Sequence, residues 1–216
     1  ANFHRAFYPS AMAAGADYST QSTHKTMSAF SQASMIHVND PDFEEIQDFF
    51  TENFNMHTST SPQYPMIASL DIARKQMVME GYSLLQRVLE LSETLKKSIN
   101  SLKKFRVLTL DDMMSPEIKN DNIRLDGTKI TIDISKSGYT SKEIEHILLS
   151  KHNIQIEKST FNTITILLTI GATYSRINRL YLALENIEER TGNKETTSSE
   201  KMLKKFKLTL SPIRFR

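Results

Sequence analysis

Residues 21–38, QSTHKTMSAFSQASMIHV, carry most of what the sequence says about its architecture. In this segment Lys25 follows the hydroxyl residues Ser22 and Thr23, and small and apolar residues come after it. Such surroundings are typical of a Schiff-base lysine, because an amine becomes a nucleophile when burial near neutral or cationic groups lowers its pKa. Hydroxyls shortly before the lysine are suited to hydrogen-bond the phosphate of a cofactor that the amine holds. An ordinary lysine at a helix end or in a loop fits the same pattern.

The segment resembles the cofactor-lysine segment of the bacterial ornithine/lysine/arginine decarboxylases, which use pyridoxal phosphate on the aspartate aminotransferase fold. Two further blocks resemble the same family and follow in the family's order. The first is residues 56–64, MHTSTSPQY. The second runs from Lys129–Ile132 through Asn153–Lys158 to Leu168–Gly171. Together the three blocks extend the resemblance over roughly residues 1–190.

The resemblance implies an α/β architecture of aspartate-aminotransferase-like type (fold type I). Residues 1–80 are expected to form the C-terminal part of a large domain that binds pyridoxal phosphate. Residues 81–190 are expected to form a small α+β domain with a long connecting helix. Residues 191–216 are expected to be a linker and the start of a further C-terminal domain, so that the chain is an internal piece of a longer subunit.

The resemblance also implies roles for individual residues. Lys25 would form the internal aldimine with pyridoxal 5′-phosphate, and Ser22 would hydrogen-bond the phosphate. His24 would lie beside the aldimine, either touching the phosphate or assisting protonation. Ser59 stands where relatives usually carry a threonine that reaches the phosphate of a neighbouring subunit. We therefore expect a homodimer or higher homo-oligomer with a shared active site.

The implied reaction is the decarboxylation of a basic amino acid, arginine or lysine rather than ornithine, to its amine and carbon dioxide. The family's aspartate at the pyridine nitrogen would fall upstream of Ala1, and Asp17 is too close to Lys25 to replace it. The phosphate loop that precedes this aspartate in the family is also missing from these residues. The alternative is therefore a noncatalytic remnant or assembly module of the same fold.

The composition is that of an ordinary globular protein, with 216 residues, 39% hydrophobic and 24% charged. The net charge of +2 gives no argument for binding nucleic acid or a membrane, and no apolar run approaches the roughly 20 residues of a membrane span. A basic tail over residues 201–216 is the one feature that favours nucleic acid, but apolar residues interrupt it. Without cysteine, and with six histidines that show no paired spacing, no metal site is expected, and a reducing cytoplasm is the expected location.

Apolar spacing predicts the elements of the first half of the chain. A turn near Gly15 leads into a short strand before the lysine, and a buried strand is expected at residues 33–38. A helix follows, and its apolar stripe of Phe43, Ile46, Phe49 and Phe50 is interpreted as core packing rather than a ligand pocket. A long helix is expected over residues 67–102, with a possible break near Gly81.

The second half alternates strand and helix patterns. Strands are expected at residues 105–110, 128–135, 154–157 and 163–170. The capping box that begins at Thr140 predicts a helix start, and a last helix is expected over residues 175–189. This order of elements favours an α+β layer with helices on one face of a sheet.

Overall fold

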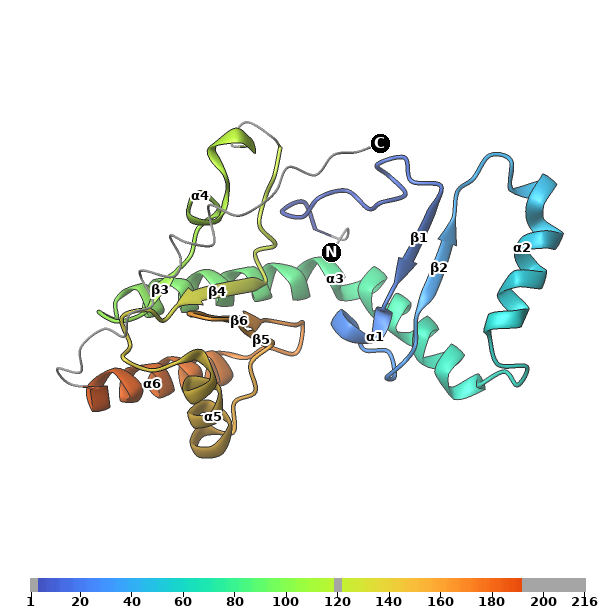
Figure 1. The fold of residues 1–216 in the computed structure, drawn as a ribbon. Coiled ribbons are helices and arrows are strands. Elements are labelled where there is room, and N and C mark those ends of the chain that lie inside the picture. The colour runs from blue at the N-terminus through green and yellow to red at the C-terminus, as the bar shows by residue number, and fades with distance from the viewer. Residues whose placement is uncertain (1–3, 119–121, 192–216) are drawn as a thin grey trace. The chain divides into compact units, whose positions relative to one another are not determined.

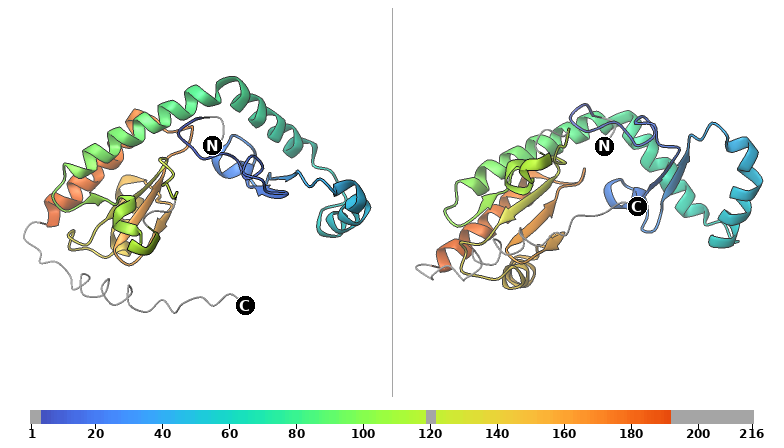
Figure 2. Two further views of the ribbon diagram at one scale, coloured as in Figure 1. Left: turned by 90° about the horizontal axis from the view of Figure 1, so that it is seen from above. Right: turned by 45° about the horizontal axis from the view of Figure 1, so that its top comes forward.

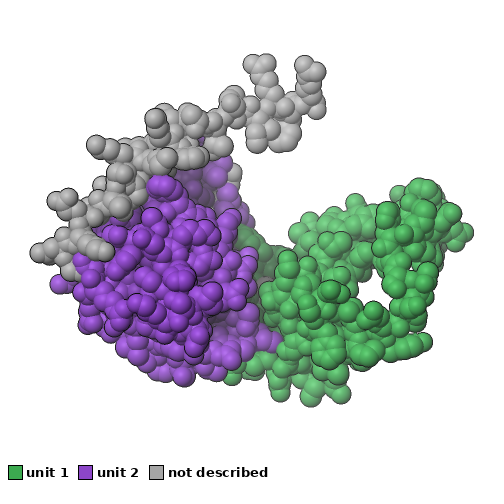
Figure 3. All heavy atoms as spheres, turned by 60° about the horizontal axis from the view of Figure 1, so that its bottom comes forward, with its two compact units in different colours: residues 1–87 green, residues 88–216 purple. Residues whose placement is uncertain are grey.

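The computed structural model describes residues 4–118 and 122–191. The chain divides into two compact units, residues 1–87 and residues 88–216 (Figure 3). Helix α3 (Tyr64–Asn100) contributes residues to both units. The division falls a few residues after the boundary expected at residue 80.

Unit 1 is built around a β-hairpin (Figure 1). Strands β1 (Tyr18–Gln21) and β2 (Met35–Val38) pair antiparallel. The single turn of helix α1 (Thr23–Thr26) lies between them in the chain, so the hairpin presents the lysine segment at its end. Both expected strands are present, with β2 shorter than predicted. The expectation that the second strand is buried is wrong, because β2 contains no buried residue and Ile36 is 45% exposed. Since a two-stranded hairpin alone is marginally stable in water, it depends on the surfaces that pack against it.

Helix α2 (Phe43–His57) follows the hairpin and packs loosely. Phe50 stacks on Tyr18 with ring centroids 6.1 Å apart and also contacts the ring of Phe43 at 5.3 Å. No residue of α2 is buried, however, and Phe49 is 71% exposed. The interpretation of the aromatic stripe as core packing is therefore wrong for the described residues, and Figure 3 shows an opening through unit 1.

Helix α3 runs without interruption, so the expected break near Gly81 is wrong. One glycine inside a helix costs only about 0.5–1 kcal/mol relative to alanine, which buried neighbours on the same helix offset. Those neighbours within unit 1 are Ala73, Met77 and Leu85. Only one other hydrophobic residue of unit 1, Ala33, belongs to the buried core of the described residues.

Unit 2 contains a four-stranded antiparallel sheet in the order β3-β4-β6-β5. The strands are β3 (Arg106–Val107), β4 (Lys129–Asp133), β5 (Lys158–Ser159) and β6 (Thr163–Leu167). The pairs Ile130↔Ile166 and Ile132↔Ile164 bring buried isoleucines side by side on one face. Because side chains alternate along a strand, the threonines between them point to the opposite face.

Helices cover the isoleucine face of this sheet. Helices α5 (Ser141–His152) and α6 (Tyr174–Thr191) join the C-terminal half of α3 in one hydrophobic cluster with β4 and β6. Figure 1 and Figure 2 show the strands of unit 2 as one layer with α6 along it. The capping box of Thr140 and Glu143 begins α5 as predicted. The expected α+β layer with helices on one face is thus present.

Two expected strands of unit 2 differ from the structure. Residues 154–157 form no strand, although the N–H of Glu157 donates to the carbonyl of Thr165 just before β5 begins. The strand expected at residues 105–110 is reduced to β3, because a capping box of Thr109 and Asp112 starts the short helix α4 (Leu110–Met113). A 3-10 turn, η1 (Pro116–Ile118), follows.

Predictions about the tail fall almost entirely outside the described residues. Thr191, expected to begin a linker, instead ends α6, and residues 192–216 are not described. Among the described residues, no helix is both long enough and apolar enough to span a bilayer.

Candidate functional site

The turn that carries Lys25 is helix α1, which begins after Ser22. Ser22 is the N-cap residue, and its side chain makes no capping hydrogen bond. The N–H of Lys25 donates to the carbonyl of Ser22 at 3.1 Å, and the N–H of Met27 donates to the carbonyl of Thr23 at 3.0 Å. These bonds close one helical turn that holds Ser22, His24 and Lys25 together. Three of the four predicted site residues therefore share one local structure.

Buried groups anchor this turn to the hairpin. Thr23 is 3% exposed, and its hydroxyl donates to the carbonyl of Gln21 at 3.5 Å. On the other side, the carbonyl of Ala33 accepts hydrogen bonds from His24, at 3.2 Å from the backbone N–H and at 2.8 Å from ring atom Nδ1. These bonds attach the start of the turn to Gln21, which ends β1, and to Ala33, two residues before β2.

The side chain of Lys25 is exposed. Among the described residues, none forms a hydrogen bond or ion pair with its amine. Burial of the amine, which the sequence pattern suggests, is therefore not provided by the described part of this chain. An exposed, unpaired amine remains accessible to an aldehyde from outside.

Ser59 lies in a different part of unit 1. It follows α2, in the loop that leads to α3, and its hydroxyl accepts a hydrogen bond from the N–H of Ser61 at 3.3 Å. In Figure 1 this loop lies well apart from α1. The structure therefore does not bring Ser59 together with Ser22, His24 and Lys25 within one chain.

The hairpin also carries a strong hydrogen bond between Tyr18 and Asp40. The phenol of Tyr18 donates to Oδ2 of Asp40 at 2.5 Å. This bond, with a smaller contribution from desolvation and from the charges of Asp40 and Asp17, raises the pKa of Tyr18 from 10.0 to about 12. The interaction ties β1 to the residues that immediately follow β2.

We expect the Tyr18 phenol to keep its proton well above the pH at which an ordinary tyrosine ionises. Because its pKa is raised in the folded chain, the interaction with Asp40 is fully present below about pH 10 and is lost as the pH rises through about 12. Ultraviolet phenolate absorbance, with Tyr18→Phe identifying the contribution of this residue, measures the transition. Asp40→Asn is expected to move it down toward pH 10, and an unchanged transition in that variant would contradict the assignment.

Sequence reasoning missed several residues that shape this site. Ala33 positions His24 through its backbone carbonyl, and no side-chain pattern signals that role. The Tyr18–Asp40 pair also went unnoticed, since the two residues are 22 positions apart. The observed antiparallel register, which pairs Tyr18 with Val38, brings the two residues to the same end of the hairpin.

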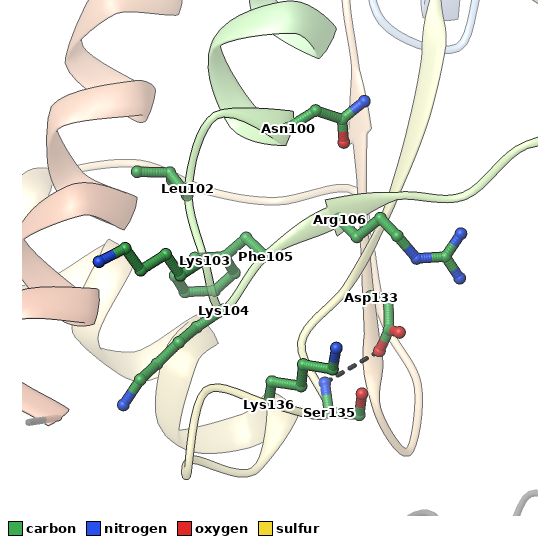
Figure 4. Close-up of a pocket in the computed structure, with 9 residues that line it drawn as sticks. All are labelled: Asn100, Leu102, Lys103, Lys104, Phe105, Arg106, Asp133, Ser135 and Lys136. Carbon is green, nitrogen blue, oxygen red and sulfur yellow. Dashed lines mark hydrogen bonds between the residues drawn. The ribbon is translucent and has the colours of Figure 1, made fainter. Parts of the chain in front are cut away.

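A cavity in unit 2 is not part of this site. It has a volume of about 160 Å³ and is lined on one side by Lys103, Lys104 and Arg106. Figure 4 shows these three side chains pointing in different directions, with Lys103 and Lys104 directed away from Arg106. Arg106 instead pairs with Asp112 at 2.9 Å. The cations therefore do not converge on one anion.

The fold has clear relatives among solved structures. The lysine decarboxylase of Francisella novicida superposes on this chain with a TM-score of 0.68 and 27% identity, over 87% of this chain and 30% of that protein. The architecture is that of the fold type I enzymes. More narrowly, the family described as "Orn/Lys/Arg decarboxylase, major domain" matches residues 1–176, so the chain belongs to the ornithine/lysine/arginine decarboxylase family.

Characterised relatives act on two basic amino acids, as their names state. An arginine decarboxylase of Bacillus cereus is 31% identical over 89% of this chain and 41% of the relative. A lysine decarboxylase of Hafnia alvei is 32% identical over 79% of this chain and 27% of the relative. The chain thus spans less than half the length of these curated relatives.

Proposed function

We propose that this chain is the lysine-bearing part of a pyridoxal-phosphate-dependent decarboxylase of a basic amino acid, arginine or lysine. The observation that carries the proposal is the anchored turn on which Ser22, His24 and Lys25 lie together, in a chain of the decarboxylase family. The names of the relatives support both substrates equally. A cytoplasmic location, expected from a sequence without cysteine, is part of this proposal.

The residues present fit the proposed cofactor. Lys25 offers an exposed amine for the cofactor's aldehyde, and the hydroxyl of Ser22, one turn earlier, is not used in capping. When bound, pyridoxal phosphate supplies the electron sink that receives the electrons left behind by the departing carboxylate. The chain's own contributions are to bind the aldehyde through Lys25, to donate a hydrogen bond to the phosphate from Ser22, and to place His24 where it either donates to the phosphate or moves a proton.

We also propose that the functional unit is a homodimer or a higher homo-oligomer. The support is that Ser59 is exposed and belongs to the loop between α2 and α3, which lies apart from α1 in its own chain (Figure 1). Its hydroxyl can donate a hydrogen bond to a cofactor phosphate only where another surface that carries the cofactor approaches it. A second subunit that brings its own Ser22 and Lys25 to Ser59 satisfies this requirement, and both sites are then completed together.

The test is to find which lysine holds the cofactor. The chain is incubated with pyridoxal phosphate, reduced with borohydride and digested, and the modified lysine is identified by mass spectrometry. We expect modification concentrated at Lys25 and, in a separate sample that is neither reduced nor digested, release of carbon dioxide from arginine or lysine. Modification spread evenly over exposed lysines would contradict the proposal. Modification at Lys25 without any carbon dioxide release would favour the noncatalytic alternative.

A further inference from the structure

Helix α1, the turn that carries Lys25, is attached to the rest of unit 1 at both of its ends. Hydrogen bonds of Thr23 and His24 attach its start to the hairpin. Its end leads into residues 27–32, and two hydrogen bonds attach this segment to helix α3. The position of Lys25, near the end of the turn, therefore depends on α3 as well as on the hairpin.

The first bond to α3 is made by the backbone of the segment. The N–H of Phe30 donates to the hydroxyl of Ser69 at 3.1 Å, and the same hydroxyl donates to the carbonyl of Met66 at 2.7 Å. Ser69 is only 5% exposed, whereas the side chain of Phe30 is 60% exposed. The segment is therefore held at this point by a hydrogen bond to a buried hydroxyl, and not by burial of the Phe30 ring.

The second bond lies two helical turns further along α3. The hydroxyl of Ser28 donates to Oε1 of Gln76 at 2.7 Å. Residues seven positions apart on a helix lie on the same face, so Ser69 and Gln76 both face the segment. Ala73, between them on this face, is 0% exposed, which shows that the face is covered between the two bonds. One face of α3 thus holds the segment at two points.

We infer that Ser69 and Gln76 are positioning residues for Lys25. No described residue bonds to the Lys25 amine, so its position is set by the backbone of the turn. Ser69 and Gln76 act on that backbone through residues 27–32 and make no bond to the amine themselves.

The consequence for the cofactor rests on the proposed function, because it assumes that Lys25 binds the aldehyde. A turn that is already fixed loses less conformational freedom on binding than a mobile one, so it binds more tightly. Ser69 and Gln76 therefore increase the affinity of Lys25 for pyridoxal phosphate without contacting it. The effect on the turn itself does not depend on that assumption.

The effect on the turn is measured without cofactor, by ¹⁵N relaxation on the full chain. Rigid backbone amides have order parameters of about 0.85, and flexible ones fall below about 0.6. A double variant, Ser69→Ala with Gln76→Met, removes both bonds and keeps the length of residue 76. We expect the order parameter of the Lys25 amide to move from the rigid value toward the flexible one. An unchanged value would overturn the inference.

The other end of the hairpin is the internal control for this measurement. The amides of Tyr18 and Val38, which pair there, are expected to keep their wild-type order parameters in the double variant. A change at Tyr18 and Val38 equal to that at Lys25 would refute the positioning role. It would mean that the two bonds support the hairpin as a whole and not the lysine turn in particular.

Single variants at Ser69 then measure the effect on the cofactor. Threonine keeps the hydroxyl at this position, and valine has nearly the same shape without it. We expect the Kd of pyridoxal phosphate at Lys25 to be about 2- to 13-fold higher in Ser69→Val than in Ser69→Thr, the effect of losing one ordinary hydrogen bond. Equal Kd values in the two variants would overturn the contribution of Ser69.

Ser83→Ala is the matched control for Ser69→Ala, which is expected to raise the Kd as Ser69→Val does. The Ser83 hydroxyl donates to the carbonyl of Glu80 at 2.9 Å, also within α3, but no described residue outside the helix bonds to it. We expect Ser83→Ala to keep the wild-type Kd, and an equal rise in both variants would refute positioning. If the Lys25 amide responds as expected but the wild-type chain never attaches the cofactor there, the proposed function fails while the role of α3 in holding the turn stands.

Discussion

Replacing Lys25 by alanine is expected to abolish the borohydride-stable attachment of pyridoxal phosphate to this chain. The amine is the group that condenses with the cofactor's aldehyde, and no other side chain on α1 offers one. Lys25→Arg is expected to fail equally, because a guanidinium keeps the charge but stays protonated. The measurement is cofactor bound per chain after reduction and removal of free cofactor.

Unit 1 supplies its own matched control. Lys75, on α3, is the only other lysine among residues 1–87 and is likewise exposed. Lys75→Ala is expected to leave attachment at the wild-type level. Because the described residues make no bond to the Lys25 amine, Lys25→Ala should change the free energy of unfolding by no more than about 0.5 kcal/mol. Undiminished attachment in Lys25→Ala, or equal loss in Lys75→Ala, would rule out Lys25 as the cofactor lysine.

The elements that the sequence predicted correctly are set by interactions between residues that are close together in the sequence. The capping box of Thr140 and Glu143 sets the start of α5 within four residues, so it was visible from the sequence. The alternation of Ile130, Ile132 and Ile134 likewise predicts a strand whose isoleucines are buried. The grouping of Ser22, His24 and Lys25 was equally predictable from the sequence, because one helical turn brings these residues together.

The features that were predicted wrongly or not at all depend on contacts between residues that are distant in the sequence. The stripe on α2 correctly predicted an amphipathic helix, but periodicity does not say what covers the apolar face, and Phe49 remains exposed. The ring of His24 is held by the carbonyl of Ala33, nine residues away, and the neighbouring Gln32 has a left-handed backbone. Glutamine has no special preference for that conformation, so its sequence signal is absent.

Replacing Ile132 by alanine is expected to destabilise unit 2 by about 2–5 kcal/mol, the range for truncating a buried isoleucine that leaves a cavity. Ile132 is 0% exposed, lies on the inner strand β4 and pairs with Ile164 of β6. Its neighbours in the hydrophobic cluster include residues of α3, α5 and α6, so the cavity borders several elements that cannot all collapse into it. The cost should therefore not fall below the lower end of this range.

Hydrogen exchange measures this loss within unit 2 alone, which a global melting curve for a chain of two units does not. The amides of β6 that bond to β4 should exchange at least about 30-fold faster in Ile132→Ala, since each 1.4 kcal/mol is a factor of ten. Thr131→Ala is the matched control. Thr131 precedes Ile132, points to the opposite face and makes one long side-chain bond, 3.5 Å to Thr165. If both variants accelerated exchange equally, the isoleucine face would not be the core of this sheet.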